Sequence, residues 1–439
     1  MKRRRLLIVA YFFPPLAGGG VHRVLSFTRG LPRHGWDCTV VCAGPRDYWV
    51  TDPSLEARID LATEVMRVSG GSGLSAWLKL RPTPQGRRPS AAFAGLRTLS
   101  DWLAFPDSYA GWAKRATPHA LRRLREGADV LMTSSPPDST HLVGLAARRA
   151  LPTRWVADFR DPWMGLHFRT PPTSWHRRRH ERMEGQVEQR ADRVLAASRT
   201  HADQLRARLS GAGRDPGKVV HLPNGYDADS SHAASEAATD APTGESFVIA
   251  FTGTLSHMPD VEVLLEAVHD LLARLHEARR RLRVRLMGPY DAGYEDRAVA
   301  LGLTGIVEFM GSRPHAEARA LQASAELLVH WQPREFATMV PGKLYEYIES
   351  GRPIVALLDP ELEAAALLRR ADAVILAPGD RVALSAELER RYREWKVQGR
   401  QPAAAREWIR EYARDHLSGQ LAQVLDGVME APLAQAANA

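Results

Sequence analysis

The sequence has 439 residues, of which 44% are hydrophobic and 25% are charged. This composition excludes a disordered or fibrous chain, and the length is about twice that of one comfortable hydrophobic core, so two domains are expected. The formal net charge of +8 indicates an anionic partner, either nucleic acid, an anionic membrane surface or a phosphorylated small molecule, unless the basic side chains only form a solvated face.

Basic residues cluster at Lys2 to Arg5, at Arg87-Arg88 and at Arg177 to Arg179. No helix-turn-helix, zinc-finger or RNA-binding signature accompanies them, so nucleic acid is not the expected partner. The basic N-terminus with its following apolar run imitates a signal peptide, but it lacks a small-residue cleavage site. No stretch reaches the roughly 18 apolar residues of a membrane-spanning helix. The chain is therefore expected to be cytoplasmic.

The first half of the chain alternates strand and helix patterns. Its opening apolar run is typical of a parallel strand buried on both faces, and a Gly-rich turn and a helical pattern follow. The expected elements are strands at 6–10, 38–42, 130–133, 155–158 and 194–197 and helices at 21–31, 141–150 and 180–191. This alternation predicts a doubly wound parallel sheet over residues 1–228, interrupted by an irregular insertion at about 46–106.

Residues 229–245 are rich in Ser, Ala, Asp and Gly, the composition of a linker. The alternation then restarts, which predicts a second Rossmann-like domain over 246–401. Its expected elements are strands at 247–252, 284–287, 307–310, 327–330 and 354–358 and helices at 261–276, 315–323 and 342–350. Two such domains would place a cleft between the carboxyl ends of their strands. An amphipathic helix at 402–431 is expected to cross back to the first domain, before a disordered tail at 432–439.

The most informative segment is 341–355. It reads as a short helix that begins after Pro341 and is closed by Gly351 as a left-handed cap. Lys343 lies in the first turn, where the helix dipole disfavours a cation by up to about 1 kcal/mol. A bound anion would reverse the sign, and the first-turn amides are available to it. Lys343 and the amide of Gly342 therefore predict a diphosphate site.

Glu346 lies one turn further along the same helix face as Lys343. Its carboxylate is placed to accept both hydroxyls of a ribose beside the diphosphate. The alternative is an i,i+3 surface pair with Lys343, worth about 0.2 to 0.5 kcal/mol. The residues alone leave both interpretations open.

The pattern Pro-x-Lys-x-x-Glu-Tyr, with Gly-x-Pro five residues after the glutamate, resembles the donor-site signature of glycosyltransferase family 4. Those are enzymes of the GT-B fold that retain anomeric configuration. The similarity continues through almost the whole chain. Residues 14–20 resemble the family's Gly-rich loop, 191–198 its AD-x-hydrophobic-x-x-S strand, 222–227 its PNG-x-D element and 251–255 the first turn of its nucleotide domain. The order and spacing of these motifs are together specific.

The resemblance implies a GT-B fold whose first domain binds a hydroxyl acceptor and whose second domain binds a nucleotide-diphosphate sugar. Glu346 would bind the donor ribose. Lys343, Gly342, Gly253 and Thr254 would bind the diphosphate, and Ser312, Arg313 and His315 would flank the base. Gly19 and Gly20 would let backbone approach the donor phosphates or the acceptor, unless they only form a strand-to-helix turn.

The sequence departs from the family pattern in two places. A second Glu, eight residues before the ribose-binding one, is here Thr338, although Glu335 is near enough to replace it near the donor sugar. The Arg and Lys usual in the first turn of the nucleotide domain are replaced by Thr254, Ser256 and His257. Neutralisation of the diphosphate would therefore rest on the lysine and amides of the helix at 342–350.

A second candidate group lies at 156–163, after a strand of the first domain. Asp158, Arg160 and Asp161 at this strand end suit acceptor binding or proton transfer, with one of the aspartates as the base because arginine stays protonated. The alternative is a buried Asp–Arg pair that fixes the loop. His141, beside a neighbouring strand end, would line the same pocket.

No metal and no cofactor are expected. His176 and His180 have the i,i+4 spacing of a metal pair, but no adjacent Glu completes a motif. Cys38 and Cys42 fit one face of a strand, and no further Cys completes a metal set. By resemblance, GT-B enzymes stabilise the departing diphosphate with helix dipoles and basic side chains.

The leading hypothesis is a retaining glycosyltransferase in cell-envelope or exopolysaccharide assembly. The acceptor is either a lipid-linked sugar at the inner membrane face, with the protein peripheral there, or a small soluble molecule. One alternative is a nucleotide-sugar 2-epimerase on the same fold. The other is an inactive scaffold that binds sugar nucleotides.

Overall fold

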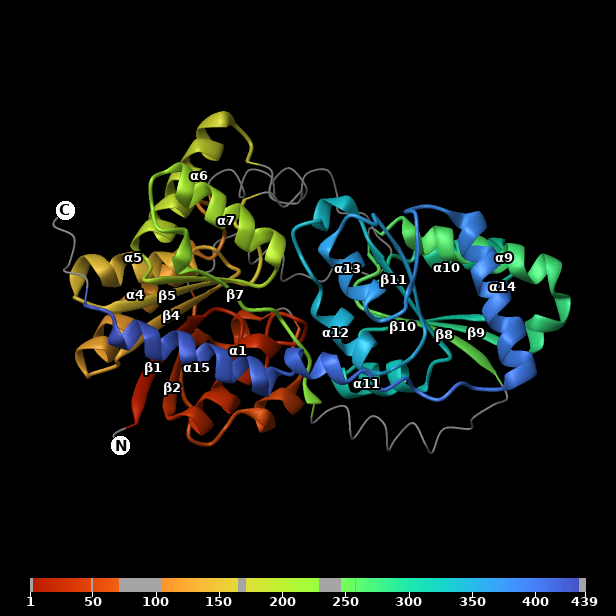
Figure 1. The fold of residues 1–439 in the computed structure, drawn as a ribbon, viewed down its shortest axis with the longest axis horizontal. Coiled ribbons are helices and arrows are strands. Elements are labelled where there is room, and N and C mark those ends of the chain that lie inside the picture. The colour runs from red at the N-terminus through yellow and green to blue at the C-terminus, as the bar shows by residue number, and fades with distance from the viewer. Residues whose placement is uncertain are drawn as a thin grey trace. The chain divides into compact units, whose positions relative to one another are not determined.

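The computed structural model describes residues 3–48, 50–70, 104–164, 171–228, 246–256 and 258–433. Its contacts divide the chain into two compact units (Figure 1). In the described ranges, unit 1 runs to Asn224 and resumes at Arg414, whereas unit 2 runs from Gly225 to Ala413. The predicted linker at 229–245, residues 71–103 of the predicted insertion and most of the predicted tail lie outside the described residues.

Unit 1 is built on a parallel sheet with the strand order β3-β2-β1-β4-β5-β6-β7. Its strands are β1 Arg4–Ala10, β2 Trp36–Ala43, β3 Glu64–Val68, β4 Val130–Ser135, β5 Arg154–Phe159, β6 Arg193–Ala196 and β7 Val219–His221. Its α-helices are α1 His22–Gly30, α4 Ala110–Arg125, α5 Thr140–Ala150, α6 Ser174–Arg190, α7 Arg199–Gly211 and α15 Arg414–Glu430. Short 3-10 helices are η1 Leu31–His34, η2 Pro45–Asp47, η3 Pro53–Arg58 and η4 Pro216–Lys218. This order is that of a Rossmann-like sheet and confirms the predicted fold of the first half.

The core of unit 1 explains the apolar run of β1 from Leu6 to Ala10. Residues 6–10 are at most 2% exposed, because helices cover both faces of the sheet. Cys38 and Cys42 lie on one face of β2 as buried free thiols, and burial raises the pKa of each to about 12. Both thiols are therefore structural core residues.

Unit 2 repeats the arrangement with the strand order β10-β9-β8-β11-β12-β13, all parallel. Its strands are β8 Phe247–Thr252, β9 Leu282–Met287, β10 Val307–Gly311, β11 Leu327–Gln332, β12 Ile354–Leu358 and β13 Val374–Leu376. Its helices are α9 Asp260–Arg274, α10 Gly293–Ala300, α11 His315–Ser324, α12 Gly342–Glu349, α13 Glu363–Arg369 and α14 Arg381–Gln398, with 3-10 helices η5 His276–Arg280, η6 Arg334–Phe336 and η7 Glu407–Tyr412. The second Rossmann-like sheet is thus confirmed.

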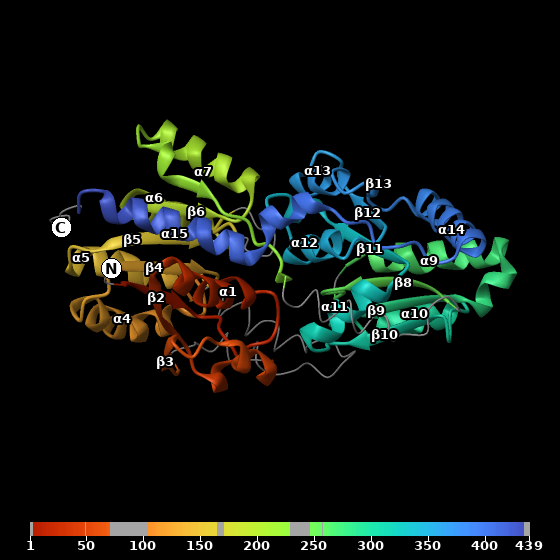
Figure 2. The ribbon, with the colours of Figure 1, turned by 60° about the horizontal axis from the view of Figure 1, so that its bottom comes forward.

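The helix predicted at 402–431 is wrong as a single element. Residues 402–406 are not helical, η7 follows, and the extended backbone at Ala413 separates it from α15. The two apolar groups belong to different cores, because Ile409 packs in unit 2 whereas Leu417 packs in unit 1. Figure 2 shows α15 in unit 1, where its Ser418 hydroxyl donates to Ser26 O of α1 at 3.4 Å.

Three glycines lie side by side at the carboxyl ends of adjacent strands in unit 2. Gly253 follows β8, Gly288 follows β9 and Gly311 is the last residue of β10, with φ values of +133°, +142° and +67°. Gly253 N donates to Met287 O at 2.8 Å, and Gly288 N donates to Gly311 O at 2.9 Å. A Cβ at Gly288 would lie 1.8 Å from Gly253 O. At Gly288 the neighbouring backbone therefore leaves no room for a side chain.

None of the helices in the described part of the chain is long and apolar enough to cross a membrane.

The glycine junction predicts that Gly288→Ala destabilises unit 2 by about 3 kcal/mol or more, from positive-φ strain plus overpacking against backbone. Gly305→Ala is the matched control, since Gly305 has φ +76° but open space where a Cβ would stand. Its cost should stay near 1 kcal/mol. Urea unfolding of both variants measures the difference, and equal midpoints would refute the account of this junction.

Candidate functional site

The start of α12 carries the most distinctive electrostatic feature of unit 2. The helix begins at Gly342 after Pro341, which provides no side-chain hydrogen bond to the first-turn amides. Gly351, with φ +69°, closes it, and a Cβ there would lie 2.6 Å from Ala404 O. The predicted left-handed cap is therefore confirmed. The positive end of the helix dipole and Lys343 lie together at this end.

Lys343 packs its ammonium against an aromatic ring. Its Nζ lies 3.7 Å from the centroid of the Phe251 ring, which stacks on Trp331 at 3.9 Å. A Cβ at Gly253 would lie 2.9 Å from Nζ, so the glycine makes room for the ammonium. No carboxylate within the described ranges forms an ion pair with Lys343.

The surroundings of Lys343 weaken its charge. Burial lowers the pKa of its amine to about 7, although the nearby Glu346 carboxylate acts in the opposite direction. A contact with an aromatic face stabilises an ammonium by only about 0.5 to 2 kcal/mol, less than an ion pair in the same place would. An anion bound at the start of α12 would raise this pKa again. We therefore expect the charge of Lys343 at neutral pH to increase when an anion binds.

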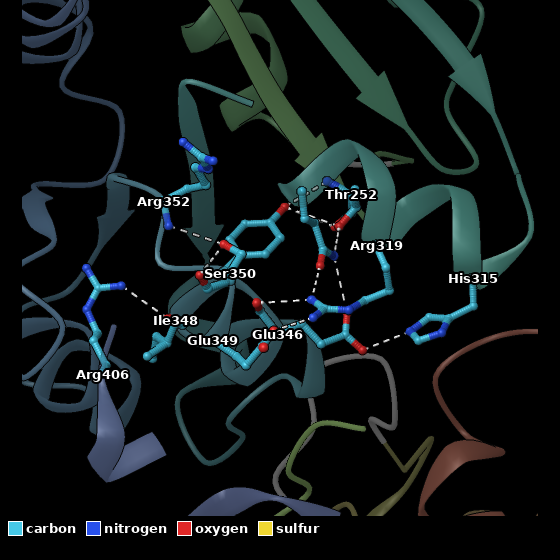
Figure 3. A network of polar contacts seen from close by, with 11 residues as sticks. Thr252, His315, Arg319, Glu346, Ile348, Glu349, Ser350, Arg352 and Arg406 are labelled. Carbon is cyan, nitrogen blue, oxygen red and sulfur yellow. Dashed lines mark hydrogen bonds and ion pairs between the residues drawn. The ribbon is translucent and has the colours of Figure 1, made fainter. Parts of the chain in front are cut away.

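Glu346 turns toward α11 rather than pairing with Lys343 on the helix surface. Its carboxylate is 7% exposed, and its Oε1 lies 2.9 Å from His315 Nε2 (Figure 3). Its Oε2 accepts from Gln322 Nε2 at 3.2 Å, and the same amide donates to Thr252 Oγ1 at 2.8 Å. The i,i+3 surface pair is therefore not formed. His315, which was predicted to flank a base, orients this carboxylate.

Arg319 joins α11 to α12 from within the core of unit 2. Its side chain is 2% exposed, its Nη1 donates to Glu346 O at 3.1 Å, and its Nη2 pairs with Glu349 (Figure 3). The sequence interpretation missed Arg319 and Gln322. His315, Arg319 and Gln322 stand at i, i+4 and i+7 of α11 and so share one helix face. This polar face is the sequence signal from which their role could have been predicted.

The other residues predicted for the donor site lie on loops of unit 2. Ser312 and Arg313 are exposed on the turn before α11, and Thr254 is exposed after β8. Glu335 is exposed on η6, whereas Thr338 is half-buried on the loop that follows. Gln332, at the end of β11, holds this loop by donating to Phe336 O and Met339 O, each at 2.8 Å. The role of Thr338 and Glu335 near the donor sugar stays a prediction.

Asp158 of unit 1 belongs to a buried ion pair that joins β5 to α1. Arg23 Nη2 lies 2.7 Å from Asp158 Oδ1, and both side chains are at most 2% exposed. Ser134 Oγ donates to Asp158 Oδ2 at 2.7 Å, and Arg23 Nη1 donates to Pro223 O at 2.8 Å. Asp158 thus forms a buried ion pair, as the alternative interpretation expected at this strand end, but its partner is Arg23 of α1 and not Arg160. This geometry argues against the prediction that Asp158 handles a proton.

Arg160 and Asp161 form a second pair at the carboxyl end of β5. Arg160 Nη2 lies 2.8 Å from Asp161 Oδ2, with side chains 17% and 13% exposed. A Cβ at Gly20 would lie 2.6 Å from Arg160 Nη1, so this glycine accommodates the guanidinium. Gly19 has open space where a Cβ would stand. Gly20 therefore has a structural explanation within unit 1, whereas Gly19 has none.

His141 is a core residue, which corrects the prediction that it lines a pocket. Its ring is fully buried, with Nδ1 2.8 Å from Thr133 Oγ1. Burial lowers the pKa of the imidazole to about 3, against the opposing effect of Asp158. His141 is therefore neutral at physiological pH and packs against Phe159.

Comparison with known proteins identifies the same two halves. The family model described as "Glycosyl transferase 4-like domain" matches residues 18–225, and that described as "Glycosyl transferases group 1" matches residues 246–394.

Curated relatives include two glycosyltransferases. D-inositol 3-phosphate glycosyltransferase 2 of Catenulispora acidiphila is 32% identical over 137 residues, which cover 29% of this chain and 31% of that protein. D-inositol 3-phosphate glycosyltransferase of Saccharomonospora viridis is 34% identical over 137 residues, with the same coverage. The matched segment thus spans about a third of the length of these relatives.

Solved structures with similar folds cover nearly the whole chain. HepE of Anabaena, in complex with UDP and glucose, superposes with a TM-score of 0.62 and 15% identity, covering 97% of this chain and 100% of that one. Sucrose-phosphate synthase from Thermosynechococcus elongatus gives a TM-score of 0.66 and 16% identity, covering 98% and 100%. At these identities the likeness shows the fold alone.

The environment of Lys343 predicts how affinity for inorganic pyrophosphate depends on pH. Because the free amine has a pKa of about 7 and a bound anion raises it, affinity should be maximal below about pH 7 and fall about tenfold per unit above it. Calorimetry of the wild type and Lys343→Gln gives the ratio of their affinities, which cancels the titration of pyrophosphate itself. Lys396→Gln, on the surface of α14, is the control. A ratio that stays flat from about pH 6 to about pH 9 would contradict this prediction.

Proposed function

The chain belongs to glycosyltransferase family 4, of the GT-B fold, and on this premise we propose that it transfers a sugar from a nucleotide-diphosphate donor to a hydroxyl group with retention. The observation that carries the proposal is the ammonium of Lys343 in the first turn of α12, with an aromatic ring rather than a carboxylate against it.

The diphosphate of the donor would bind at the start of α12. There the helix dipole, the first-turn amides and the Lys343 ammonium all favour negative charge. As the glycosidic bond to the diphosphate breaks, charge grows on the leaving oxygen, and these fixed groups stabilise it without reorganisation. Because Gly253 has no Cβ, the Lys343 side chain can lie at the end of β8, where its ammonium would meet the phosphates. The proposal includes no metal and no cofactor.

Glu346 would bind the ribose of the donor. Ionised carboxylate oxygens are the acceptors that ribose hydroxyls need, and those of Glu346 are in contact with His315 Nε2 and Gln322 Nε2. The two donors come from α11 and hold the carboxylate in one orientation. Its geometry therefore does not depend on the ligand, which favours affinity.

The acceptor would bind to unit 1. Asp161, held by Arg160 and partly exposed, is the carboxylate at the end of β5 that we propose for accepting the hydroxyl proton. The departing diphosphate is the other acceptor for that proton. Open space at Gly19 supports backbone approach of a ligand at this loop.

We propose a lipid-linked sugar as the acceptor, in envelope or exopolysaccharide assembly at the inner face of the cell membrane. The net charge of +8 supports a peripheral position at an anionic surface. HepE, whose fold is similar, was solved with UDP-glucose, which makes this donor the first to test.

The proposed ribose contact predicts a double-mutant result. UDP should bind the wild type about ten- to a hundredfold more tightly than 2′,3′-dideoxy-UDP, since the dideoxy ribose cannot donate hydrogen bonds to the Glu346 carboxylate. Glu346→Ala should bind both ligands with nearly equal, weaker affinity. Glu317→Ala, an exposed change on α11, should behave as wild type. If Glu346→Ala keeps the full preference for UDP, the ribose assignment is wrong.

The activity itself is tested by release of UDP from UDP-glucose, with and without a membrane lipid extract as acceptor. The proposal predicts UDP release that depends on the acceptor. The rate should fall at least a hundredfold in Lys343→Gln, which is the effect typical of removing one group that stabilises charge in the transition state. A 2-epimerase would change the nucleotide sugar without any acceptor. A binding scaffold would bind UDP and turn over nothing.

A further inference from the structure

Helix α6, Ser174–Arg190, divides its residues sharply between two faces. Its buried residues are Glu184, Val187 and Glu188. On the opposite face, Trp175, Arg178, Arg179 and Arg182 stand at i, i+3, i+4 and i+7, and all four are exposed. We call these four residues the α6 stripe. Figure 1 shows α6 at the surface of unit 1, beside α7.

The tryptophan of the α6 stripe is unusual for this chain. Its side chain is 53% exposed, and of the tryptophans in the described ranges it alone is exposed. The Arg179 guanidinium lies 5.1 Å from the Trp175 ring and 4.1 Å from the Phe105 ring. The indole is therefore held by its neighbours while most of it faces outward, and an exposed ring of this size favours a partner surface.

The arginines of the α6 stripe have no carboxylate partners among the residues that the structure describes. Helix α14 is also rich in arginine, but there Arg390, Arg391 and Arg393 each pair with a glutamate of the same helix. Arginine content alone therefore does not explain the α6 stripe. One exposed glutamate, Glu181, flanks it and leaves an excess of positive charge.

The buried carboxylates of α6 do not offset that excess. Arg208 of α7 binds Glu184 Oε1 at 2.9 Å and Glu188 Oε1 at 2.5 Å. Burial raises the pKa of Glu184 to about 8, with Arg208 opposing the shift. Arg208 engages both buried carboxylates on the inner face of α6, away from the α6 stripe, so they form no ion pair with its arginines.

We propose that the α6 stripe is the surface by which unit 1 docks on an anionic lipid bilayer. Indole rings favour the headgroup region of a bilayer, and guanidinium groups bind lipid phosphates with paired hydrogen bonds. Charge complementarity commits the proposal to this partner, since the stripe combines one rigid aromatic ring with three cations. The proposal deepens the lipid-linked acceptor suggested above by naming the surface that would meet the membrane.

Flotation of the full chain with lipid vesicles tests this docking, without donor or acceptor. Vesicles of phosphatidylcholine with phosphatidylglycerol should bind the wild type at least tenfold better than phosphatidylcholine alone, and raising the salt to about 1 M should abolish the difference. The triple variant Arg178→Gln/Arg179→Gln/Arg182→Gln should bind about a hundredfold more weakly, at roughly fivefold per arginine. Trp175→Ala should lose several-fold at every salt concentration.

The charge-matched control is Arg280→Gln/Arg281→Gln/Arg410→Gln, three exposed arginines of unit 2. It should bind vesicles as the wild type does. Unchanged circular dichroism and unchanged UDP affinity of the α6 variant exclude misfolding and keep this test separate from that of the transferase activity. Equal losses in both triple variants, no binding by the wild type, or tighter binding to duplex DNA than to the vesicles would overturn the proposal.

Discussion

The donor-side account depends on one contact, that of the Lys343 ammonium with the face of Phe251 at the positive end of α12. A helix dipole and burial both disfavour a cation there, and an aromatic face offsets only part of this cost. Neighbouring features follow from the contact. A side chain at position 253 would collide with Nζ, which explains the glycine there. Phe251 is held in place by its stack on Trp331. We propose that a bound diphosphate turns this unfavourable arrangement into a favourable one.

The same helix carries, one turn apart, the two residues to which we assign the diphosphate and the ribose of the donor. Lys343 and Glu346 share a face, yet the carboxylate is held by His315 and Gln322 of α11 and not by the lysine. If the two had formed a surface pair, the lysine charge would be neutralised before a ligand arrived. The two aspartates of unit 1 also differ. Asp158 forms a buried ion pair with Arg23, whereas Asp161 lies partly exposed at the end of β5.

Much of the fold could be predicted from the sequence, because buried parallel strands consist of apolar runs and glycines mark the turns between elements. The bounds of β8 and β12 were predicted exactly as the structure has them. The short edge strands β3 and β7 were missed, since few of their residues are buried and periodicity is faint in them. The break at Ala413 was missed because the apolar spacing continues across it, and only the assignment of Ile409 and Leu417 to different cores reveals it.

The candidate site divides in the same way. Lys343 and Glu346 were found because motif and helix position agree within a few residues. The partners of charged groups were not predictable, since Arg23 lies 135 residues from Asp158 and Gln322 lies 24 residues from Glu346. Tertiary packing decides such pairs, and a single sequence holds no record of it.

Nitrogen-15 NMR of protein labelled only at lysine Nζ measures the central claim most directly, because the chain has few lysines and Lys343→Arg identifies the signal. The account predicts a pKa near 7 for the Lys343 amine in the free protein, and a rise of more than about one unit when UDP saturates it. An ordinary lysine pKa in the free protein, or one that UDP leaves unchanged, would contradict it.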